Sequence, residues 1–390
     1  MPRSESETVG RPDWVLLGAT LALVAIGLLM VYSSTADLAL RGNKESGYYF
    51  QQQAKWLSLG LLALIVVTWL PHRFWMKISI PLMAFTVLLL AFVAIFRDSR
   101  HLLGNSVSPV EPAKLAVVVY IGHWLSSKGD LVRRLPYGLL PFTIIVGLVA
   151  GLVMVQEDPD LSEAMVIILV AMAMFFLSGA DLIQFAIGVM GGSAAFILVI
   201  TQVPEALKRL RMFVQAWKDP FSSANIQMMR GLEALGSGGL FGLGPGAGRM
   251  KFFWLPNAHT DSIFAILGEE FGLIGSLAVL ALFAVLVYRG FRIASQAVDP
   301  FGRLLASGIT CWIGTQALVN LAVVTNTIPF TGIALPFISV GGSSLGTCLA
   351  GVGLLLSISR VSSVEVSGFD ARRLANNQYQ PSEVGRRVLP

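Results

Sequence analysis

The sequence predicts an all-α polytopic membrane protein with about ten transmembrane helices and one long extracytoplasmic loop. The 390 residues are 55% hydrophobic and only 13% charged, and their mean hydropathy is +0.71, which leaves too little polar surface for a water-soluble fold of this size. A helix that crosses the hydrocarbon core of a bilayer needs about 20 apolar residues, and the chain repeats such runs. Its four histidines show no metal-ligand spacing, and its two cysteines lie in separate apolar runs, which favours buried thiols over a disulfide.

Ten apolar runs are expected to cross the membrane. The first follows a polar segment and has no small-residue cleavage site before a soluble domain, so it is interpreted as a retained helix rather than a signal peptide. Residues 1–13 form a short segment before the ten-helix domain (14–360), and residues 361–390 form a polar tail that is expected to be loose. The predicted spans are 14–33, 54–70, 75–96, 111–126, 136–155, 160–178, 183–201, 262–288, 302–325 and 338–360.

The distribution of basic residues predicts how the spans are oriented, because short cytoplasmic loops carry an excess of Lys and Arg. The opposite short loops carry fewer cations, and residues 157–160 carry none. Both termini are therefore predicted to be cytoplasmic, in agreement with an even number of spans. The basic residues on the predicted cytoplasmic side are Arg3, Arg11, Arg73, Lys128, Arg133, Arg134, Arg289, Arg292, Arg360, Arg372 and Arg373.

One connection, residues 202–260, is much longer than the others and faces outward by the span count. Long connections in compact proteins are usually functional or disordered. This one has apolar anchors such as Met212 and Phe213, and its residues 226–235 have helical spacing. We expect an ordered flap over a site.

Two polar features lie near the outward ends of spans. Glu111 and Lys114 are three residues apart and share a helix face, so they form either an internally paired couple or part of a site. Residues 157–163 contain four carboxylates, which either cap a helix N-terminus or bind a divalent cation or a cationic ligand.

A glycine-rich segment, residues 236–248, is followed by Arg249 and Lys251. Glycines allow backbone N–H groups to converge on an anion, but the strand and helix that a dinucleotide fingerprint requires are missing. A flexible or tightly turned loop beside two cations is the preferred interpretation.

Asp261 is the residue that most requires an explanation, because it places a carboxylate where a membrane-spanning helix meets water. It is either a dipole partner in the first turn of that helix or a functional group. Below it, at helical spacing, small residues form a stripe that favours close helix packing or lines a groove. Glu269 and Glu270, about two turns deeper, need partners inside the bundle. The stripe consists of Ala265, Gly268, Gly272 and Gly275.

Three blocks of sequence jointly resemble the SEDS family of bacterial cell-wall proteins, whose members include FtsW, RodA and SpoVE. The similarity runs from the first span to Arg360, and the first outer loop together with Ala258 and His259 is closer to the division-type FtsW branch than to the elongation-type RodA branch. The blocks are 255–261 (Leu-Pro-Asn-Ala-His-Thr-Asp) with 262–275, the glycine-rich 236–242, and 329–345.

The resemblance implies a multi-pass peptidoglycan glycosyltransferase of the bacterial cytoplasmic (inner) membrane, acting in division or elongation. Such an enzyme polymerises lipid II, a disaccharide-peptide on undecaprenyl pyrophosphate, into glycan strands outside the membrane. The implied partner is a class B penicillin-binding protein, a transpeptidase that cross-links the strands; membrane lipid is a further contact, and nucleic acid is not expected. Two other functions stay open, a flippase for lipid-linked precursors and a non-catalytic scaffold for the penicillin-binding protein.

The resemblance also implies roles for single residues. Asp261 matches the family's essential aspartate and is expected to be catalytic. The chain departs from the family pattern at Gln52, Val110, Ser162, Glu163 and Asn257, while Asp261, Glu111 and Lys114 are retained. The residues expected to bind substrate are Glu111, Lys114, Asp160, Arg249, Lys251 and His259.

The implied chemistry needs one base and several positive charges. A positioned carboxylate can take the proton from the acceptor hydroxyl, and partial desolvation favours this by raising the pKa of a carboxylate. The leaving pyrophosphate needs charge neutralisation rather than a proton. Lys114 held by Glu111, the loop cations, or a divalent cation (Mg²⁺ or Mn²⁺) are the alternatives for that role.

Overall fold

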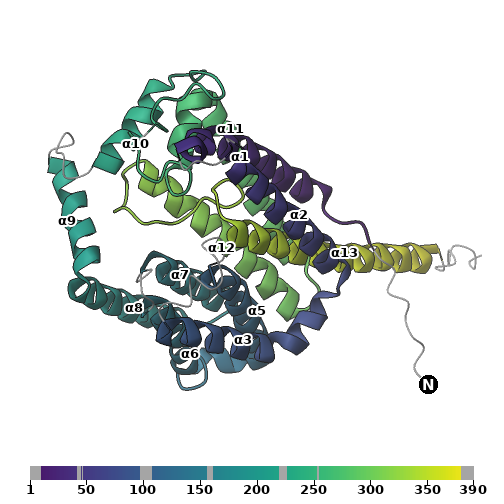
Figure 1. Cartoon of the computed structure of the whole chain (residues 1–390). Coiled ribbons are helices and arrows are strands. Elements are labelled where there is room, and N and C mark those ends of the chain that lie inside the picture. The colour runs from purple at the N-terminus through teal and green to yellow at the C-terminus, as the bar shows by residue number, and fades with distance from the viewer. Residues whose placement is uncertain are drawn as a thin grey trace, which may run out of the picture.

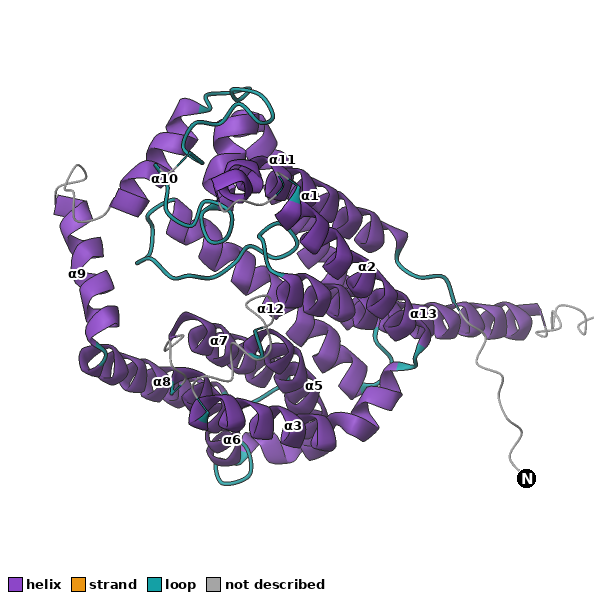
Figure 2. Ribbon diagram, viewed as in Figure 1, coloured by secondary structure: helices purple, strands orange, loops and turns teal. Residues whose placement is uncertain are grey.

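The computed structural model describes residues 10–41, 45, 47–96, 108–155, 161–218, 226–252 and 254–378 of the chain. Over these residues the chain forms helices joined by turns and loops, with no strand (Figure 2). The helices are α1 (Trp14–Arg41), α2 (Tyr48–Trp69), α3 (His72–Ile95), α5 (Val110–Lys128), the 3₁₀ helix η1 (Gly129–Arg133), α6 (Leu139–Met154), α7 (Leu161–Leu177), α8 (Leu182–Gln202), α9 (Pro204–Lys218), α10 (Ile226–Ser237), α11 (Ile263–Gln296), α12 (Pro300–Val324) and α13 (Gly342–Gln378).

Each of the ten predicted spans corresponds to a helix, which confirms the all-α membrane fold. Seven of these helices, α1, α2, α3, α8, α11, α12 and α13, contain a stretch long and apolar enough to cross a membrane. The apolar helices α6 and α7 are shorter. The remaining one, α5, carries Glu111 and Lys114 in its first two turns.

Helix α12 lies in the middle of the bundle and packs against α11, α5, α7 and α13 (Figure 1). In its most apolar 18-residue window, 72% of the residues are buried. Small residues allow this close approach. A Cβ atom on Gly308, for example, would lie 2.6 Å from the sulfur of Met174 and 2.7 Å from a Val118 methyl carbon. Because α12 contacts α5 and α7 as well as α11 and α13, its side chains can join groups from distant parts of the sequence.

Helix α13 packs along α2 and then continues beyond the other helices (Figure 1). Its backbone is helical to Gln378, so the polar tail predicted after Arg360 begins as a continuation of this helix. Proline would stop a helix, and the first proline after the span is Pro381. Residues 379–390 lie outside the described part of the chain.

The long connection 202–260 contains two helices, α9 and α10, followed by the glycine-rich segment. The predicted helical spacing of residues 226–235 is confirmed by α10, which packs against α11. The glycine-rich segment is tightly turned, with positive φ at Gly239, Gly242, Gly244 and Gly246. It is therefore ordered, as expected for this connection.

The glycine-rich segment docks onto an interruption in α11. Gly272 has φ 68° and ψ −165° in the middle of that helix, a conformation that glycine adopts readily. The N–H groups of Leu243 and Leu273 donate to the carbonyl oxygens of Glu269 and Gly239, each at 2.9 Å. Non-helical backbone at membrane depth is tolerated where protein groups satisfy it. Gly268 and Gly272 of the small-residue stripe serve close packing, because a Cβ atom on either would lie 2.4 Å from an atom of Leu235 or Gly242.

Candidate active site

Asp261 lies in the loop just before α11. Helix α11 begins at Ile263 with Ser262 as its N-cap residue, so Asp261 precedes the first turn, and the alternative that placed it inside that turn is wrong. Its side chain is half-buried. A Cβ atom on the exposed Gly332 would lie only 3.4 Å from Asp261 Oδ2. Glycine at position 332 therefore keeps the space beside the carboxylate open.

Three consecutive carbonyl oxygens hold the Asp261 loop in place. The Asp261 carbonyl oxygen accepts a hydrogen bond from Asn320 Nδ2 at 2.8 Å. The Thr260 carbonyl oxygen accepts one from Ser339 Oγ at 2.7 Å, and that of His259 accepts one from the Val340 N–H at 3.0 Å. These donors come from α12 and from the loop after it. The backbone at Asp261 is therefore fixed to these two segments.

Asn320 is a site residue that the sequence-based prediction did not include. It is only 1% exposed, and its Nδ2 atom also donates to the Ile333 carbonyl oxygen at 2.7 Å. Its Oδ1 atom is buried and has no hydrogen-bond partner among the described residues. Losing a buried donor leaves its acceptors unsatisfied at a cost of about 1–3 kcal/mol. The available signal was a polar amide inside a membrane span, which is unusual enough to indicate function.

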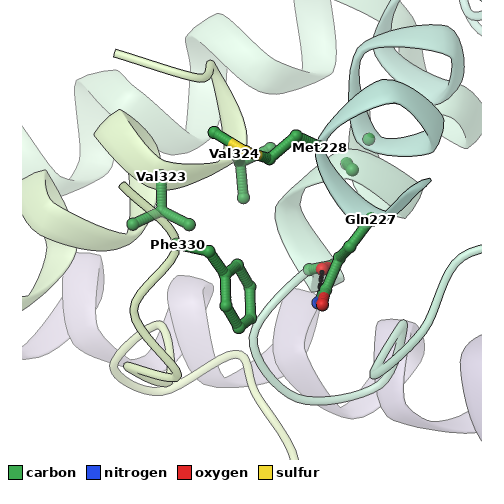
Figure 3. Close-up of a pocket in the computed structure, with 8 residues that line it drawn as sticks. Gln227, Met228, Val323, Val324 and Phe330 are labelled. Carbon is green, nitrogen blue, oxygen red and sulfur yellow. Dashed lines mark hydrogen bonds between the residues drawn. The ribbon is translucent and has the colours of Figure 1, made fainter. Parts of the chain in front are cut away.

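Gln227 of α10 holds the same loop from the other side. Its Nε2 atom donates to the Pro256 carbonyl oxygen and to Ser262 Oγ, both at 3.2 Å. Gln227 and Ser262 line a small recess that is otherwise mostly apolar, in which Gln227 and Phe330 face one another (Figure 3). The recess lies where α10, α11 and α12 meet, and one of its lining residues, Ser262, directly follows Asp261 in the chain. The other lining residues are Met228, Gly231, Ala265, Val323 and Val324.

His259, a predicted substrate-binding residue, is half-buried in this loop. Burial lowers the pKa of its imidazole below the ordinary value of 6.5, which favours the neutral form at pH 7. A neutral imidazole can donate or accept a hydrogen bond. Any contact of His259 with substrate is therefore one of hydrogen bonding rather than charge.

Lys114 lies in a buried cluster between α5, α7 and α12. Its Nζ atom is 3.0 Å from Glu111 Oε2 and 2.8 Å from Glu163 Oε2, and the side chain is 2% exposed. One ammonium thus faces two carboxylates, where the sequence suggested a single partner. Glu163, one of the departures from the family pattern, is therefore part of the cluster. The fold depends on such a buried ion cluster being complete, because removal of one partner leaves an uncompensated buried charge.

Gln316 connects this cluster to the loop that faces Asp261. Its Oε1 atom accepts hydrogen bonds from Lys114 Nζ at 3.0 Å and from Trp312 Nε1 at 2.9 Å. Its Nε2 atom donates to the Ala334 carbonyl oxygen at 3.1 Å. Gln316, like Asn320, was not predicted as a site residue, because both are defined by contacts with chain segments remote in sequence.

The cations after the glycine-rich segment have different surroundings. Lys251 Nζ is 2.7 Å from Glu270 Oε1 and donates to Ser33 Oγ at 2.8 Å, and its side chain is 5% exposed. Arg249 has an exposed side chain, while its backbone N–H donates to Glu269 Oε1 at 2.7 Å. Glu269 and Glu270 thus find the partners that the sequence required, and Lys251 is held inside the protein by a buried ion pair.

Asp160 lies outside the described residues, as does most of the acidic block 157–163. Among the residues that the structure describes, no three His, Cys, Asp or Glu side chains gather as metal ligands would.

Comparison with known proteins identifies relatives over nearly the whole chain. A family described as "Cell cycle protein" (FTSW_RODA_SPOVE) matches residues 13–364. Stage V sporulation protein E of Bacillus subtilis is 38% identical over 363 residues, which cover 90% of this chain and 98% of that protein. The probable peptidoglycan glycosyltransferase FtsW of Trichlorobacter lovleyi is 36% identical over 359 residues, 89% of this chain and 93% of that protein.

Solved structures share the fold. Rod shape determining protein RodA of Thermus thermophilus is similar with a TM-score of 0.64 and 26% identity, over 92% of this chain and 98% of that chain. A chain from a structure described as "Structural coordination of polymerization and crosslinking by a peptidoglycan synthase complex" is similar with a TM-score of 0.71 and 26% identity, over 90% of this chain and 98% of that chain. On sequence and fold together, this chain belongs to the SEDS family of integral membrane proteins, which includes FtsW, RodA and SpoVE.

Proposed function

We propose that this chain is a peptidoglycan glycosyltransferase that polymerises lipid II into glycan strands at the outer face of the bacterial cytoplasmic membrane. The observation that carries this proposal is the placement of Asp261, a half-buried carboxylate next to a glycine, on a loop held by three consecutive carbonyl hydrogen bonds. Several relatives at 35–37% identity bear the name of that enzyme, which agrees with this placement.

Asp261 acts as the general base in the proposed reaction. The oxygen of the acceptor hydroxyl forms a bond to the anomeric carbon of the donor sugar, and the bond from that carbon to the pyrophosphate breaks. The carboxylate of Asp261 accepts the hydroxyl proton, and undecaprenyl pyrophosphate leaves with the bonding electron pair. A fixed base contributes about 10²- to 10⁴-fold to such a step, and the bound backbone of the loop keeps it in place.

The leaving pyrophosphate requires positive charge but no proton. Arg249 suits this role, because its side chain is exposed in the same connection that leads to Asp261. Lys114 and Lys251 are each enclosed with carboxylates, so we assign them to holding the frame of the site. A divalent cation such as Mg²⁺ or Mn²⁺ that arrives with the pyrophosphate would add neutralisation, and no described residue is assigned to it.

The proposed function also implies how the chain is oriented in the membrane and which protein it works with. Both termini lie in the cytoplasm, so that the connection 202–260 and Asp261 lie on the outer side, where lipid II presents its sugars. A class B penicillin-binding protein cross-links the product, as suggested by the likeness to a chain of a peptidoglycan synthase complex. Relatives named FtsW favour a role in division, and the relative named for sporulation shows that the same fold serves other stages.

The decisive experiment is a gel assay of the purified protein with lipid II, with and without a class B penicillin-binding protein. Glycan ladders that require Asp261 support the enzyme. Translocation of a fluorescent lipid in protein-containing vesicles, without ladders, would favour a flippase. If neither glycan ladders nor lipid translocation is observed, but the protein stimulates the transpeptidase, the result would favour a non-catalytic scaffold.

A further inference from the structure

Helix α9 is set apart from the rest of the bundle. A single residue, Val203, separates it from the end of the membrane-spanning helix α8. From there it crosses to α10 at the end of the bundle that lies away from the protruding end of α13 (Figure 1). The helix against which it packs most is α8. Helix α9 thus follows directly on a candidate membrane span and runs across that end of the bundle.

The side chains of α9 divide into two faces. Ala206, Leu207, Leu210 and Val214 recur at helical spacing and form an apolar stripe. This stripe is not buried by the protein, because Leu210 is 38% and Val214 47% exposed. Beside the stripe, three cations have exposed side chains: Lys208, Arg209 and Arg211.

One contact ties α9 to the candidate active site. The guanidinium of Arg209 lies 5.9 Å from the ring centroid of Phe330, and Phe330 lines the recess that also contains Ser262, the neighbour of Asp261. Ala216, the one buried residue among the described side chains of α9, is 6% exposed. The side that carries Arg209 and Ala216 therefore faces the protein, while the Leu210 and Val214 side faces outward.

We propose that α9 is an interfacial helix that lies in the lipid headgroup layer and binds anionic phospholipids through Lys208 and Arg211. A basic amphipathic helix of low overall hydrophobicity buries its apolar face at the boundary between headgroups and acyl chains. Cations that flank this face attract the phosphates of anionic lipids. The short link to α8 and the charge of the flanks favour a bilayer over a protein partner.

The proposal that α9 binds lipid is independent of the proposed function. Its consequence for the candidate active site rests on that function. Because α9 connects α8 to α10 and touches Phe330, its depth in the headgroup layer sets the position of the recess beside Asp261. Anionic lipid would then act as a positional support for the loop that carries the catalytic carboxylate.

The test uses the full-length protein in nanodiscs with an environment-sensitive dye on a single new cysteine. Val214→Cys places the dye on the apolar stripe, and Glu205→Cys places it on an exposed position of the opposite face. The unsubstituted protein, treated in the same way, corrects for labelling of the native cysteines. We expect blue-shifted emission and quenching by shallow spin-labelled lipid at position 214 but not at position 205.

Charge selectivity is measured by raising the fraction of phosphatidylglycerol in phosphatidylcholine nanodiscs. The emission shift at position 214 should grow with phosphatidylglycerol, and Lys208→Gln with Arg211→Gln should reduce this growth by at least about fivefold. The matched control removes two exposed cations from α3, Arg73→Gln with Lys77→Gln, and should leave the response unchanged.

Two outcomes would overturn the inference. Equal aqueous exposure of the dyes at positions 214 and 205 would show that α9 does not enter the lipid and that its apolar stripe is available to a protein partner. Shielding at position 214 that is independent of phosphatidylglycerol would remove the anionic-lipid site. Either result leaves the glycosyltransferase proposal intact, because neither readout depends on polymerisation.

Discussion

Gln316 and Asn320 lie one turn apart on α12 and bind two adjacent carbonyl oxygens of the loop after it. Gln316 Nε2 is 3.1 Å from the Ala334 oxygen, and Asn320 Nδ2 is 2.7 Å from the Ile333 oxygen. Residues four apart share a helix face, so one side of α12 holds this loop. Through their remaining bonds the two amides join the buried Lys114 cluster to the backbone of Asp261.

Asp261→Asn is expected to reduce lipid II polymerisation by at least roughly 10²-fold, because the amide cannot accept the hydroxyl proton. The rate of glycan formation by purified protein is the measurement. Asp181→Asn is the matched control, since Asp181 is an exposed N-cap residue of α8 and asparagine caps a helix equally well. Polymerisation by Asp261→Asn at the rate of the control would sink the catalytic assignment.

Asn320→Leu is expected to lower kcat by about tenfold or more while the KM for lipid II changes little. The substitution removes both donor bonds of the amide, and a small displacement of the base costs rate rather than binding. Gln227→Leu removes the longer bonds on the other side of the loop, at 3.2 Å, and should have a smaller effect on kcat. An unchanged kcat with a raised KM for Asn320→Leu would instead place Asn320 in substrate binding.

Lys114→Met is expected to destabilise the protein by about 3–5 kcal/mol, because it leaves two buried carboxylates without their cation. Thermal unfolding in detergent measures this. The triple change Lys114→Met with Glu111→Gln and Glu163→Gln removes the unpaired charges and should be more stable than Lys114→Met alone. If Lys114→Met unfolds like the unsubstituted protein but loses polymerisation, Lys114 contacts the pyrophosphate directly.

The N-cap of α12 should make stability depend on pH in the acid range. Asp299 Oδ1 is 2.6 Å from His72 Nε2, and Oδ2 accepts from the Gly302 N–H at 2.9 Å. Burial alone would raise the pKa of Asp299, but these hydrogen bonds and the charges of His72 and Arg73 hold it below its ordinary value. A carboxyl with a lowered folded-state pKa stabilises the protein above about pH 4, and this stabilisation is lost as the pH falls further.

Asp299→Asn tests that pH dependence. Asparagine can still cap α12, so the substitution removes mainly the charge, which is worth about 1–2 kcal/mol at pH 7. The difference in the free energy of unfolding between the two proteins should shrink as the pH is lowered from about 5 to about 3. A constant difference over this range would show that the hydrogen bond to His72 does not depend on the ionised carboxylate.

Cysteines placed before α11 and near its C-terminal end should be labelled from opposite sides of the membrane. Arg249→Cys and Arg292→Cys each place a thiol at an exposed position, one in the long connection and one near the far end of α11. A membrane-impermeant thiol reagent is expected to label position 249 in intact cells and position 292 only after permeabilisation. The reverse pattern would invert the topology and exclude polymerisation by Asp261 outside the cell.

The sequence by itself determined the helical membrane architecture and singled out Asp261 as the candidate catalytic residue. Runs of apolar residues are sufficient to predict spans, because the bilayer requires about 20 of them and the backbone must satisfy its own hydrogen bonds. The spacing of residues 226–235 likewise predicted α10. Asp261 could be recognised because a carboxylate at the mouth of a span is costly and rarely placed there without a function.

Only the tertiary structure decided which groups surround these residues. Lys114 and Gln316 are separated by 202 positions, and Asp261 and Asn320 by 59, so no local periodicity could pair them. The break in α11 at Gly272 was also hidden, since the sequence around it has the composition of an uninterrupted helix and the break exists because the glycine-rich segment supplies hydrogen bonds there. Helix periodicity records which face is apolar, whereas contacts between remote segments depend on how the helices cross.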